Sequence, residues 1–365
     1  MKVETLQLRN FRNYENTSVA FSPDLNVITG HNAQGKTNLL ESLVYLSLTR
    51  SHRIADEKKL IRNDMPFADI RCRIDDEGIK KDLRAIIHPN GKTLRIDQIP
   101  VKKSSDFIGA VNVILFSPDD LYIFSDHPQT RRKIMDQEIT KVSPGYLTSL
   151  NKYRNLMKER NDLLKNMNID MRYLDILDEQ MADLMEAVIA KRQKFIETVN
   201  LHMPQIYREL SMDETVTVNV RYKKCCMEAD REHLLQMMKD SRQRDIDYRI
   251  TNNGIHREDL LFEMNDVSLI QQASQGQKRM TMLAFKMALM KYIQAETGKQ
   301  PVLLLDDVLS ELDAERQRRL LEMIRGRCQC IITAAEIPAH MKNLAWTGFY
   351  VEQGRITAEK QGGSI

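Results

Sequence analysis

The distribution of apolar residues divides the chain into segments with strand periodicity and segments with helix periodicity. Short apolar runs bounded by turn residues dominate residues 1 to about 125, and residues 25–29 form one of them. Two further runs, 83–87 and 93–96, flank Asn90-Gly91, a pair typical of hairpin turns. Residues 38–46 instead repeat apolar positions at helical spacing. This part of the chain is predicted to contain strands, turns and one helix.

From about Thr130 the pattern becomes helical. One apolar stripe with steps of mostly three residues consists of Leu147, Leu150, Tyr153, Leu156 and Met157. A longer stripe consists of Leu174, Leu177, Met181, Leu184, Val188, Phe195 and Val199. Residues 166–170 between them predict a hairpin tip, so we expect an antiparallel helical arm. Pro204 should kink or end its second helix.

After the arm, strands and helices alternate again. We expect a strand at 215–220, a charged helix at 231–244, a helix at 280–293 and an apolar strand at 301–305. The predicted fold class is therefore α/β: a mixed sheet with helices forms a head, and a mainly helical arm domain is inserted into it. The expected domains are 1–125 (first half of the head), 126–249 (arm) and 250–365 (second half of the head).

Residues 30–37, Gly-His-Asn-Ala-Gln-Gly-Lys-Thr, form a complete phosphate-binding loop between the strand at 25–29 and the helix at 38–46. Gly30 and Gly35 let the backbone fold so that several amide N–H groups face one point and bind phosphate oxygens. Lys36 can reach the outer phosphates, and the Thr37 hydroxyl can ligate Mg²⁺. These features predict a nucleotide site rather than a glycine turn that only caps a helix. The predicted contacts are Gly30, His31, Asn32, Ala33, Gln34, Gly35, Lys36, Thr37 and Asn38.

The apolar strand at 301–305 leads directly into Asp306 and Asp307. Buried parallel strands are typically continuous hydrophobic runs, and carboxylates at such a strand's end can serve a metal and a water. Asp306 is predicted to face the Mg²⁺ shell together with Thr37. Asp307 is the predicted catalytic residue, which orients or deprotonates the attacking water. The alternative, that two acids simply end a strand, loses weight beside the loop at 30–37.

Two short polar segments complete the pattern. Residues 273–279, Ala-Ser-Gln-Gly-Gln-Lys-Arg, precede the helix at 280–293 and can form an anion site from exposed N–H groups. Taken alone, a serine N-cap with a glycine needs no ligand. Residues 310–313, Ser-Glu-Leu-Asp, follow the two aspartates. This order of phosphate loop, Ser-x-Gly-Gln, Asp-Asp strand and Ser-x-Leu-Asp is similar to that of ABC-type ATPases.

The similarity is closest to the RecF family of the SMC-like branch. The strand at 6–14 resembles the opening of SMC-like proteins. Segments that resemble RecF lie, in the family's order, at 51–53, 113–121, 131–136, 254–260, 273–279 and 303–313. A length of 365 residues fits this family, whereas an SMC protein would need hundreds of residues of coiled coil.

The resemblance implies an ABC-type P-loop ATPase head that binds ATP and Mg²⁺, with Arg12 and Asn13 among the nucleotide contacts. It implies a homodimer on ATP, in which the signature residues of one protomer complete the site of the other. Those signature residues are Ser274, Gln275, Gly276, Gln277 and Lys278. Ser310 and Asp313 would belong to the D-loop.

The implied function is an ATP-dependent DNA-binding clamp of recombinational DNA repair. It would bind duplex DNA and single-strand gaps or junctions, and help load the recombinase with the mediator proteins RecR and RecO. The resemblance also implies a weak, DNA-stimulated ATPase that serves as a switch, and two departures from ABC-type ATPases indicate slow hydrolysis. Asp307 stands where glutamate is usual. No histidine directly follows the strand at 330–332, and of the threonines that RecF-like proteins favour at this point the chain has only Thr333.

Composition adds few constraints. Apolar residues make up 42% and charged residues 29% of the chain, as expected for a globular protein with a core. The net charge of +3 permits a nucleic-acid partner without requiring one. No apolar stretch reaches the length of a membrane span, and the N-terminus has no secretory signal, so a cytoplasmic protein without a membrane partner is expected. The five cysteines lack the spacing of a zinc site.

Candidate DNA contacts are the basic residues of the arm, although alternating charges on a helix usually form a solvated face. They are Arg131, Arg132, Lys133, Lys152, Arg154, Lys158 and Arg160. A groove between the heads of a dimer, with Lys58, Lys59 and Arg62, is the rival location. Two other functions remain open: a transporter's nucleotide-binding subunit, which usually carries Leu-Ser-Gly-Gly-Gln and no helical insertion, and a non-hydrolysing module that ATP holds together.

Overall fold

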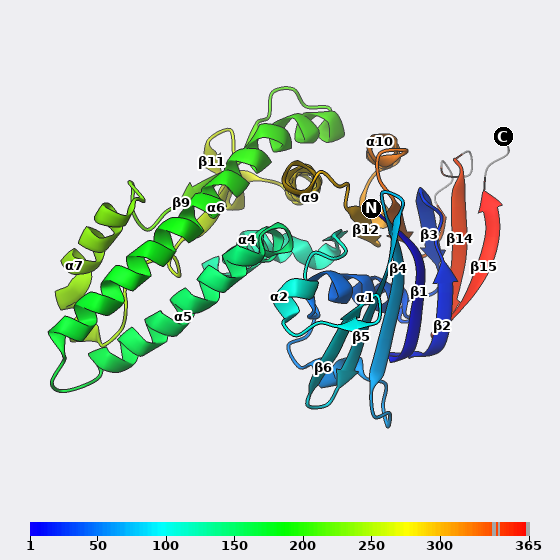
Figure 1. Cartoon of the computed structure of the whole chain (residues 1–365). Helices are drawn as coiled ribbons and strands as arrows, with labels where there is room; N and C mark the ends of the chain where they lie inside the picture. The colour runs from blue at the N-terminus through cyan, green and yellow to red at the C-terminus, as the bar shows by residue number, and fades with distance from the viewer. Residues whose placement is uncertain (338–340, 342–343, 363–365) are drawn as a thin grey trace. The chain divides into compact units, whose positions relative to one another are not determined.

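In the computed structural model the chain forms two compact units, each built from discontinuous stretches of sequence (Figure 1). Unit 1 contains Met1–Leu121, Gln205–Glu214 and Arg279–Ile365, and unit 2 contains Tyr122–Pro204 and Thr215–Lys278. The structure describes all residues except 338–340, 342–343 and 363–365. The sheets and helices of the two units confirm the predicted α/β fold class.

The first sheet of unit 1 is antiparallel, with strand order β2-β1-β4-β5-β6-β7. Its strands are β1 (Lys2–Phe11), β2 (Tyr14–Ala20), β4 (Ala68–Asp76), β5 (Ile79–His88), β6 (Gly91–Ile96) and β7 (Ile99–Pro100). Apolar and polar residues alternate along β1 and β4, so one face is buried and the other is polar. The hairpin predicted around Asn90-Gly91 is present, because His88 pairs with Gly91.

The second sheet of unit 1 is mixed, with strand order β15-β14-β3-β13-β12-β8. Its strands are β3 (Leu25–Thr29), β8 (Val113–Phe116), β12 (Val302–Asp306), β13 (Cys330–Thr333), β14 (Trp346–Glu352) and β15 (Arg355–Gly362). All except β15 run parallel to their neighbours. Thr333 pairs with Ile28 on one side and with Asp306 on the other, so the carboxyl ends of β3, β13 and β12 meet at one edge.

Helix α1 (Lys36–Leu48) lies in the core of unit 1. Leu39, Leu40 and Leu43 belong to one apolar cluster that also contains residues of both sheets, such as Leu6 and Leu304. A helix buried on nearly all sides reads as an almost continuous apolar run, as this one does. The remaining helical segments of unit 1 are η1 (Glu57–Leu60), α2 (Ser104–Phe107), η2 (Pro118–Leu121), η3 (Leu309–Glu311) and α10 (Ala314–Ile324).

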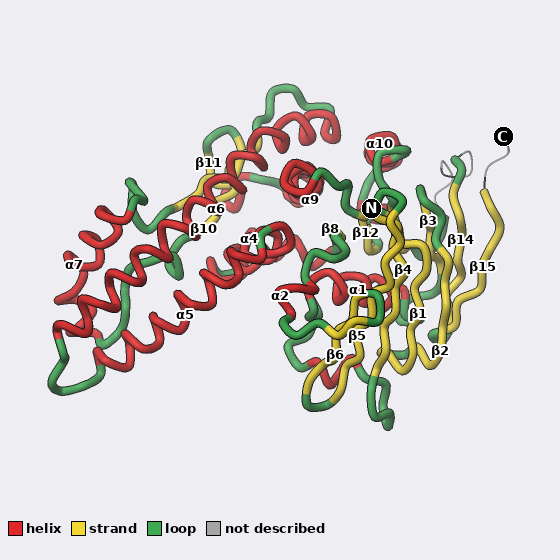
Figure 2. Tube along the Cα trace, viewed as in Figure 1, coloured by secondary structure: helices red, strands yellow, loops and turns green. Residues whose placement is uncertain are grey.

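Unit 2 is mainly helical (Figure 2). Its elements are α3 (Tyr122–Ser125), α4 (Pro128–Val142), α5 (Pro144–Leu164), α6 (Met171–Ser211, of which the residues from Gln205 onward belong to unit 1), β9 (Val218–Lys223), α7 (Arg231–Tyr248), β10 (Asp259–Met264), β11 (Val267–Ser268) and α8 (Leu269–Gln272). The antiparallel pair α5 and α6, joined by residues 165–170, confirms the predicted arm. Pro204 does not end the second helix, which continues to Ser211. The strand expected from residue 215 begins at Val218.

Residues 250–278, expected in the second half of the head, belong by packing to unit 2. The reason is that β10 pairs along its whole length with β9, and with β11 it forms a three-stranded sheet. Helix α9 (Gln275–Thr297) begins in unit 2 and continues into unit 1. The packing boundary therefore falls inside a helix, where the sequence pattern gives no signal.

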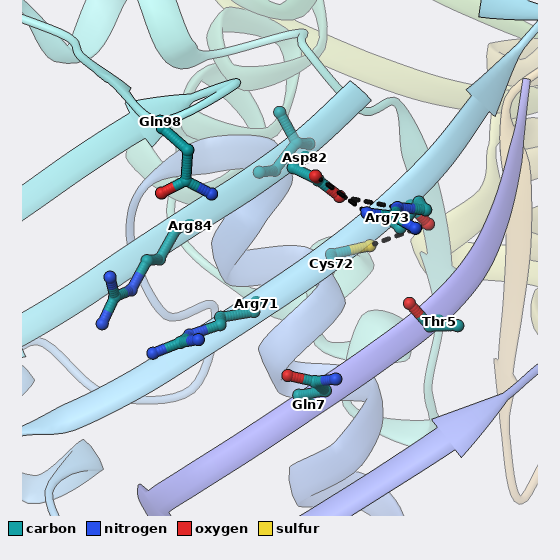
Figure 3. Close-up of a pocket in the computed structure, with 9 residues that line it drawn as sticks. Thr5, Gln7, Arg71, Cys72, Arg73, Asp82, Arg84 and Gln98 are labelled. Atoms are coloured by element: carbon teal, nitrogen blue, oxygen red, sulfur yellow. Dashed lines mark hydrogen bonds and ion pairs between the residues drawn. The ribbon is translucent and has the colours of Figure 1, made fainter. Parts of the chain in front are cut away.

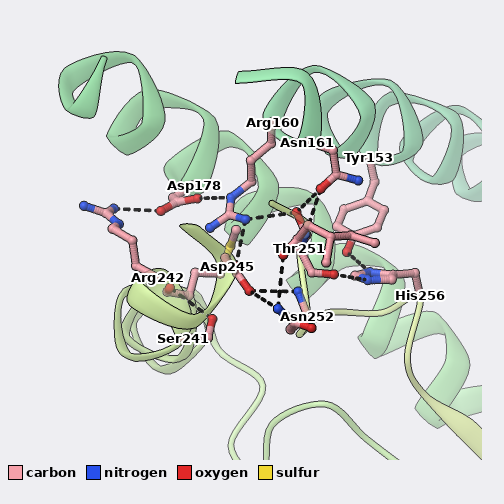
Figure 4. A network of polar contacts seen from close by, with 12 residues as sticks. Tyr153, Arg160, Asn161, Asp178, Ser241, Arg242, Asp245, Thr251, Asn252 and His256 are labelled. Atoms are coloured by element: carbon pink, nitrogen blue, oxygen red, sulfur yellow. Dashed lines mark hydrogen bonds and ion pairs between the residues drawn. The ribbon is translucent and has the colours of Figure 1, made fainter. Parts of the chain in front are cut away.

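A buried polar network connects the helices of the arm (Figure 4). Arg160 of α5 is fully buried, and its Nε donates to Asp178 of α6 at 2.6 Å. Another guanidinium nitrogen donates to Asp245 of α7 at 2.8 Å and to the Thr251 hydroxyl at 2.9 Å. One arginine thus joins three helices and the loop after α7.

Replacing Arg160 with methionine is expected to destabilise the protein by about 3–5 kcal/mol, because buried carboxylates lose their counter-charge. The measurement is urea unfolding. Lys165→Met is the matched control, since Lys165 pairs with Asp162 at the exposed end of α5 and should change stability by less than about 0.5 kcal/mol. Equal unfolding midpoints for the two variants would contradict this role of Arg160.

Candidate nucleotide site

The loop at residues 30–35 connects β3 to α1, as predicted. Gly30 and Gly35 have φ values of +140° and +121°, which side chains rarely allow. A Cβ atom on Gly30 would lie 2.3 Å from the backbone oxygen of Val351, and one on Gly35 would lie 2.6 Å from Nδ2 of Asn13. The two glycines are therefore required by their conformation and by close packing, against backbone at Gly30 and against side chains at Gly35.

Lys36 directs its side chain back into this loop. Its ammonium donates to the backbone oxygen of Gly30 and, at 3.1 Å, to that of His31. Burial lowers the pKa of Lys36, and the charges of Asp307 and Asp306 oppose that shift. The loop thus encloses a cation at the point toward which phosphate oxygens would be drawn. His31, Asn32 and Ala33 at the tip of the loop are exposed.

Thr37, Asp306 and Thr333 form a chain of hydrogen bonds across the carboxyl ends of the central strands. The hydroxyls of Thr37 and Thr333 donate to the same oxygen, Oδ1 of Asp306, at 3.0 and 2.6 Å. Burial raises the pKa of Asp306, and these two hydrogen bonds oppose the shift. The predicted metal-binding pair, Thr37 and Asp306, is brought together although 269 residues separate its members.

Asp307 has an unusual local structure. Its φ of +54° lies in the left-handed region, which is uncommon for a residue other than glycine. Its backbone N–H donates to the Thr333 hydroxyl at 3.0 Å and to the Thr333 backbone oxygen at 3.2 Å. Its Oδ1 is enclosed without a hydrogen-bond partner among the described residues. A strained residue with an unsatisfied carboxylate oxygen is the kind of feature that occurs at functional sites.

The donor set fits Mg²⁺. Adjacent oxygens around octahedral Mg²⁺, bound at about 2.1 Å each, lie about 3 Å apart. The Thr37 hydroxyl and Asp306 Oδ1 are 3.0 Å apart. Thr37 and Asp306 would hold the ion directly or through water, and Mg²⁺, when bound, would neutralise phosphate charge.

Arg12 and Asn13, predicted as nucleotide contacts, support the loop and the first turns of α1. Asn13 donates to the backbone oxygen of Gln34 at 2.7 Å and accepts from Asn38 at 2.9 Å. Arg12 forms two hydrogen bonds of 2.9 Å to Glu41, a fully buried carboxylate of α1. Their side chains thus hold Gln34, Asn38 and α1 in place.

Several residues that shape the site were not assigned by sequence reasoning. Arg53 donates to Asn38 at 3.0 Å, and its charge is near enough to influence the Asp306 carboxyl. In the turn between β14 and β15, the N–H of Gln353 donates to the Gln34 side chain at 2.7 Å, and Gly354 donates to the Gln34 backbone at 3.1 Å. Similarity to RecF at 51–53 was the one available signal for Arg53, and none existed for the turn.

The signature residues begin helix α9. The Ser274 hydroxyl accepts from the N–H of Gln277 at 3.2 Å, while the Gln277 side chain accepts from the N–H of Ser274 at 2.9 Å. This reciprocal arrangement is a capping box. Ser274, Gln275 and Gly276 are exposed, and Lys278 is half-buried. The segment therefore has a stable local structure and an accessible surface.

The two D-loop residues have different local roles. Ser310 donates its hydroxyl to the backbone oxygen of Asp307 at 2.7 Å, which ties this segment to the candidate catalytic residue. Asp313 is the N-cap of α10 and accepts from the N–H of Arg316 at 2.9 Å.

The arm residues predicted to contact DNA fall into two groups. Arg131 and Arg160 are buried and paired, Arg131 with Asp259 at 2.7 Å, so the prediction that they contact DNA is wrong. The half-buried Arg132 donates to the backbone oxygen of Glu258. Lys133, Lys152, Arg154 and Lys158 are exposed, and Arg154 also contacts Asp136 at 3.5 Å. A basic residue on a helix can pair with a buried carboxylate or face solvent, and sequence spacing alone does not distinguish the two cases.

A mixed sheet with a phosphate loop after β3, two aspartates after β12 and a Ser-x-Gly-Gln helix start defines an ABC-type ATPase fold. Families described as "AAA ATPase domain" and "RecF/RecN/SMC N terminal domain" match residues 1–254 and 178–357. An SMC head domain of Pyrococcus furiosus shares the fold, with a TM-score of 0.56 at 17% identity over 98% of this chain and 96% of that chain.

Curated relatives identify the particular family. The chain is 38% identical to the DNA replication and repair protein RecF of Listeria monocytogenes serotype 4b, over 98% of this chain and 99% of the relative. It is 39% identical to that of Enterococcus faecalis, over 98% of each chain. The solved structure "recombination mediator protein RecF-ATP in RecFOR pathway" matches with a TM-score of 0.90 at 28% identity, over 98% of each chain. The chain belongs to the RecF family.

No helix among the described residues has both the length and the apolar character needed to cross a membrane.

Proposed function

We propose that this chain is a cytoplasmic, ATP-dependent DNA-binding protein of recombinational DNA repair that hydrolyses ATP slowly and uses ATP as a switch. The observation that carries the proposal is the chain of contacts from Thr37 through Asp306 and Thr333 to Asp307. It brings the phosphate loop and two carboxylates together at the sheet edge. Family membership supplies the context, because the relatives are named DNA replication and repair proteins.

Each side chain of the site has a role in this proposal. Lys36 balances the charge of the outer phosphates, Thr37 and Asp306 hold Mg²⁺, and Asp307 orients or deprotonates the attacking water. Hydrolysis is slow for two reasons. The first is that the side chain of Asp307 is one methylene shorter than the usual glutamate. The second is that no histidine directly follows β13: Thr333 lies there instead, and its hydroxyl donates to Asp306.

We propose that ATP joins two copies of the chain. In this arrangement the exposed residues Ser274, Gln275 and Gly276 of one protomer face the γ-phosphate held by Lys36 of its partner. The accessible, capped start of α9 supports this role.

Sedimentation should therefore show a monomer without nucleotide and a dimer with ATP·Mg²⁺. Gly276→Glu places a bulky charged side chain in the signature segment and should prevent dimerisation while leaving ATP binding intact. Gly145→Glu is the matched control, since Gly145 is exposed at the start of α5 with open space around it. One mass in both nucleotide states, with ATP confirmed bound, would exclude ATP-dependent dimerisation.

We further propose that the ATP-bound dimer binds duplex DNA and its junctions with single-strand gaps. It then helps to load a recombinase together with RecO and RecR proteins. The solved relative with ATP is titled as part of the RecFOR pathway, which supports these partners. Lys152, Arg154 and Lys158 are the exposed arm residues that could contact DNA phosphates.

The experiment is a binding assay on duplex, single-stranded and gapped DNA with and without ATP·Mg²⁺, alongside phosphate release. We expect ATP to strengthen binding to duplex and gapped DNA, and DNA to raise a low rate of phosphate release. Equal affinity with and without ATP would contradict a nucleotide-controlled clamp. DNA binding without any phosphate release would instead indicate a non-hydrolysing module.

A further inference from the structure

The outer face of the first sheet of unit 1 is rich in arginine (Figure 3). The inner face of this sheet is apolar and packs in the core with α1. The outer face presents five arginines from four adjacent strands. They are Arg9 on β1, Arg71 and Arg73 on β4, Arg84 on β5 and Arg95 on β6. Arg9, Arg71 and Arg73 are exposed, and the other two are half-buried.

Three of these arginines lie in one row across the sheet. In the strand register Gln7 pairs with Arg71, Arg71 with Arg84, and Arg84 with Arg95. Like charges directly opposite one another on neighbouring strands destabilise a sheet by up to about 1 kcal/mol per pair. Asp69 offsets this repulsion between Arg71 and Arg84, whereas no carboxylate in these contacts offsets it between Arg84 and Arg95.

Two carboxylates beside these arginines neutralise only part of their charge, while Asp75 on the same face pairs with Lys80. Asp69, which is buried, accepts hydrogen bonds from both Arg71 and Arg84 at 2.8–3.1 Å. Burial raises the pKa of Asp69, but the two arginines outweigh that effect and hold it below its usual value, so Asp69 stays ionised. Asp82 pairs with Arg73 at 2.8 Å.

The other two arginines, Arg9 and Arg95, do not pair with Asp69 or Asp82. Nε of Arg95 is enclosed and lacks a hydrogen-bond acceptor among the described residues. The guanidinium of Arg9 lies 5.6 Å from the centre of the Phe67 ring. Five guanidinium groups and two paired carboxylates leave this face with a local excess of positive charge, although the whole chain carries only +3.

The face is also hollowed. A hollow of about 360 Å³ is lined by Thr5, Gln7 and Gln98 together with Arg71, Arg73 and Arg84. A second hollow of about 550 Å³ shares Gln7 and Arg71 with the first and adds Arg9 and Asn16. Two carboxylates also line it, those of Asp69 and of Glu15, which pairs with Arg62. Guanidinium groups beside uncharged amide and hydroxyl donors are the groups that bind phosphate and sugar oxygens of nucleic acids.

We propose that this outer sheet face, centred on Gln7 and Arg71, binds the phosphate backbone of DNA. The proposal rests on the DNA-binding function proposed for the chain and gives that function a surface. Charge complementarity is the argument for the occupant: the surplus guanidinium groups match a polyanion. Contacts of this kind position a protein on DNA without selecting a base sequence.

The loss-of-contact test uses Arg9→Gln/Arg71→Gln. This pair removes two charges, while Asp69 keeps its hydrogen bonds from Arg84. The affinity for duplex DNA should fall about tenfold or more, and the dependence of log affinity on log salt should flatten by about two units. Phosphate release without DNA should not change. The control Lys239→Gln/Arg318→Gln removes two exposed charges from α7 and α10 and should alter neither quantity comparably.

The gain-of-contact test uses Asp82→Asn, which keeps the size of the side chain and frees Arg73. DNA affinity should rise severalfold and the salt dependence should steepen by about one unit. A misfolded variant could not give this result. Glu322→Gln on α10, whose carboxylate pairs with Arg318, is the control and should leave DNA binding unchanged.

The possible results distinguish failure of the sheet face as the DNA surface from failure of the proposed DNA-binding function. If the parent protein binds DNA but Arg9→Gln/Arg71→Gln and Asp82→Asn bind with the parent's affinity and salt dependence, this face is not the DNA surface. The face is also not the DNA surface if DNA affinity falls only in the arm variant Lys152→Gln/Arg154→Gln/Lys158→Gln. The same conclusion follows if the sheet variants bind DNA normally but no longer bind an acidic protein partner. A parent protein that binds no DNA in any nucleotide state overturns the proposed function itself.

Discussion

Asp307→Asn is expected to bind ATP, hold the dimer together and lower the rate of phosphate release by about 100-fold or more. A positioned general base contributes roughly 10²–10⁴ in rate. Asparagine keeps the size and hydrogen-bonding capacity of the side chain but cannot carry the negative charge that orients or deprotonates water. The left-handed backbone of Asp307 also tolerates asparagine well, so the local structure should persist.

Single-turnover phosphate release and equilibrium ATP binding should be measured on the same preparation. The prediction is that Asp307→Asn loses phosphate release and keeps ATP binding. Glu311→Gln is the matched control, because Glu311 follows closely in the chain and pairs with Arg279 at 2.8 Å. If Asp307→Asn releases phosphate at the parent's rate while Glu311→Gln does not, Glu311 is the catalytic carboxylate.

Lys36→Ala is expected to lower ATP affinity by about 100-fold or more and to abolish the ATP-dependent dimer. Charge-assisted hydrogen bonds contribute roughly 1.5–3 kcal/mol each, and about 2.7 kcal/mol corresponds to a hundredfold change in affinity. The ammonium already lies in the loop, held by the backbone oxygens of Gly30 and His31. Removal of the ammonium group leaves the ATP phosphates without a balancing positive charge in the phosphate loop.

Two comparisons make the Lys36→Ala result specific. Lys59→Ala, an exposed lysine of η1, should bind ATP as the parent does. Asp306→Ala should weaken binding in the presence of Mg²⁺ much more than in its absence, whereas Lys36→Ala should weaken both. Calorimetric titration with ATP, with and without Mg²⁺, distinguishes the two patterns. Parent-like affinity of Lys36→Ala would mean that the nucleotide binds elsewhere.

The sequence determined the parts of this protein whose signal is local. The strand at 25–29, the glycines at 30 and 35 and the lysine and threonine after them form a contiguous motif, so its structure follows from neighbouring residues. The apolar run before Asp306 and Asp307 identified a buried strand, and three-and-four spacing identified the arm helices. The order of these motifs also identified the family.

Tertiary structure decided what depends on residues far apart in the chain. Thr333 reaches Asp306 and Asp307, and the turn at Gln353 holds Gln34, because strand order places them side by side. Arg131 and Arg160 have the same sequence character as exposed arginines of the arm but meet carboxylates from distant segments and are buried. The arginine row on the first sheet likewise arises from cross-strand register. Sequence spacing reports which residues share a face of one element, whereas charge pairing and register depend on which elements become neighbours.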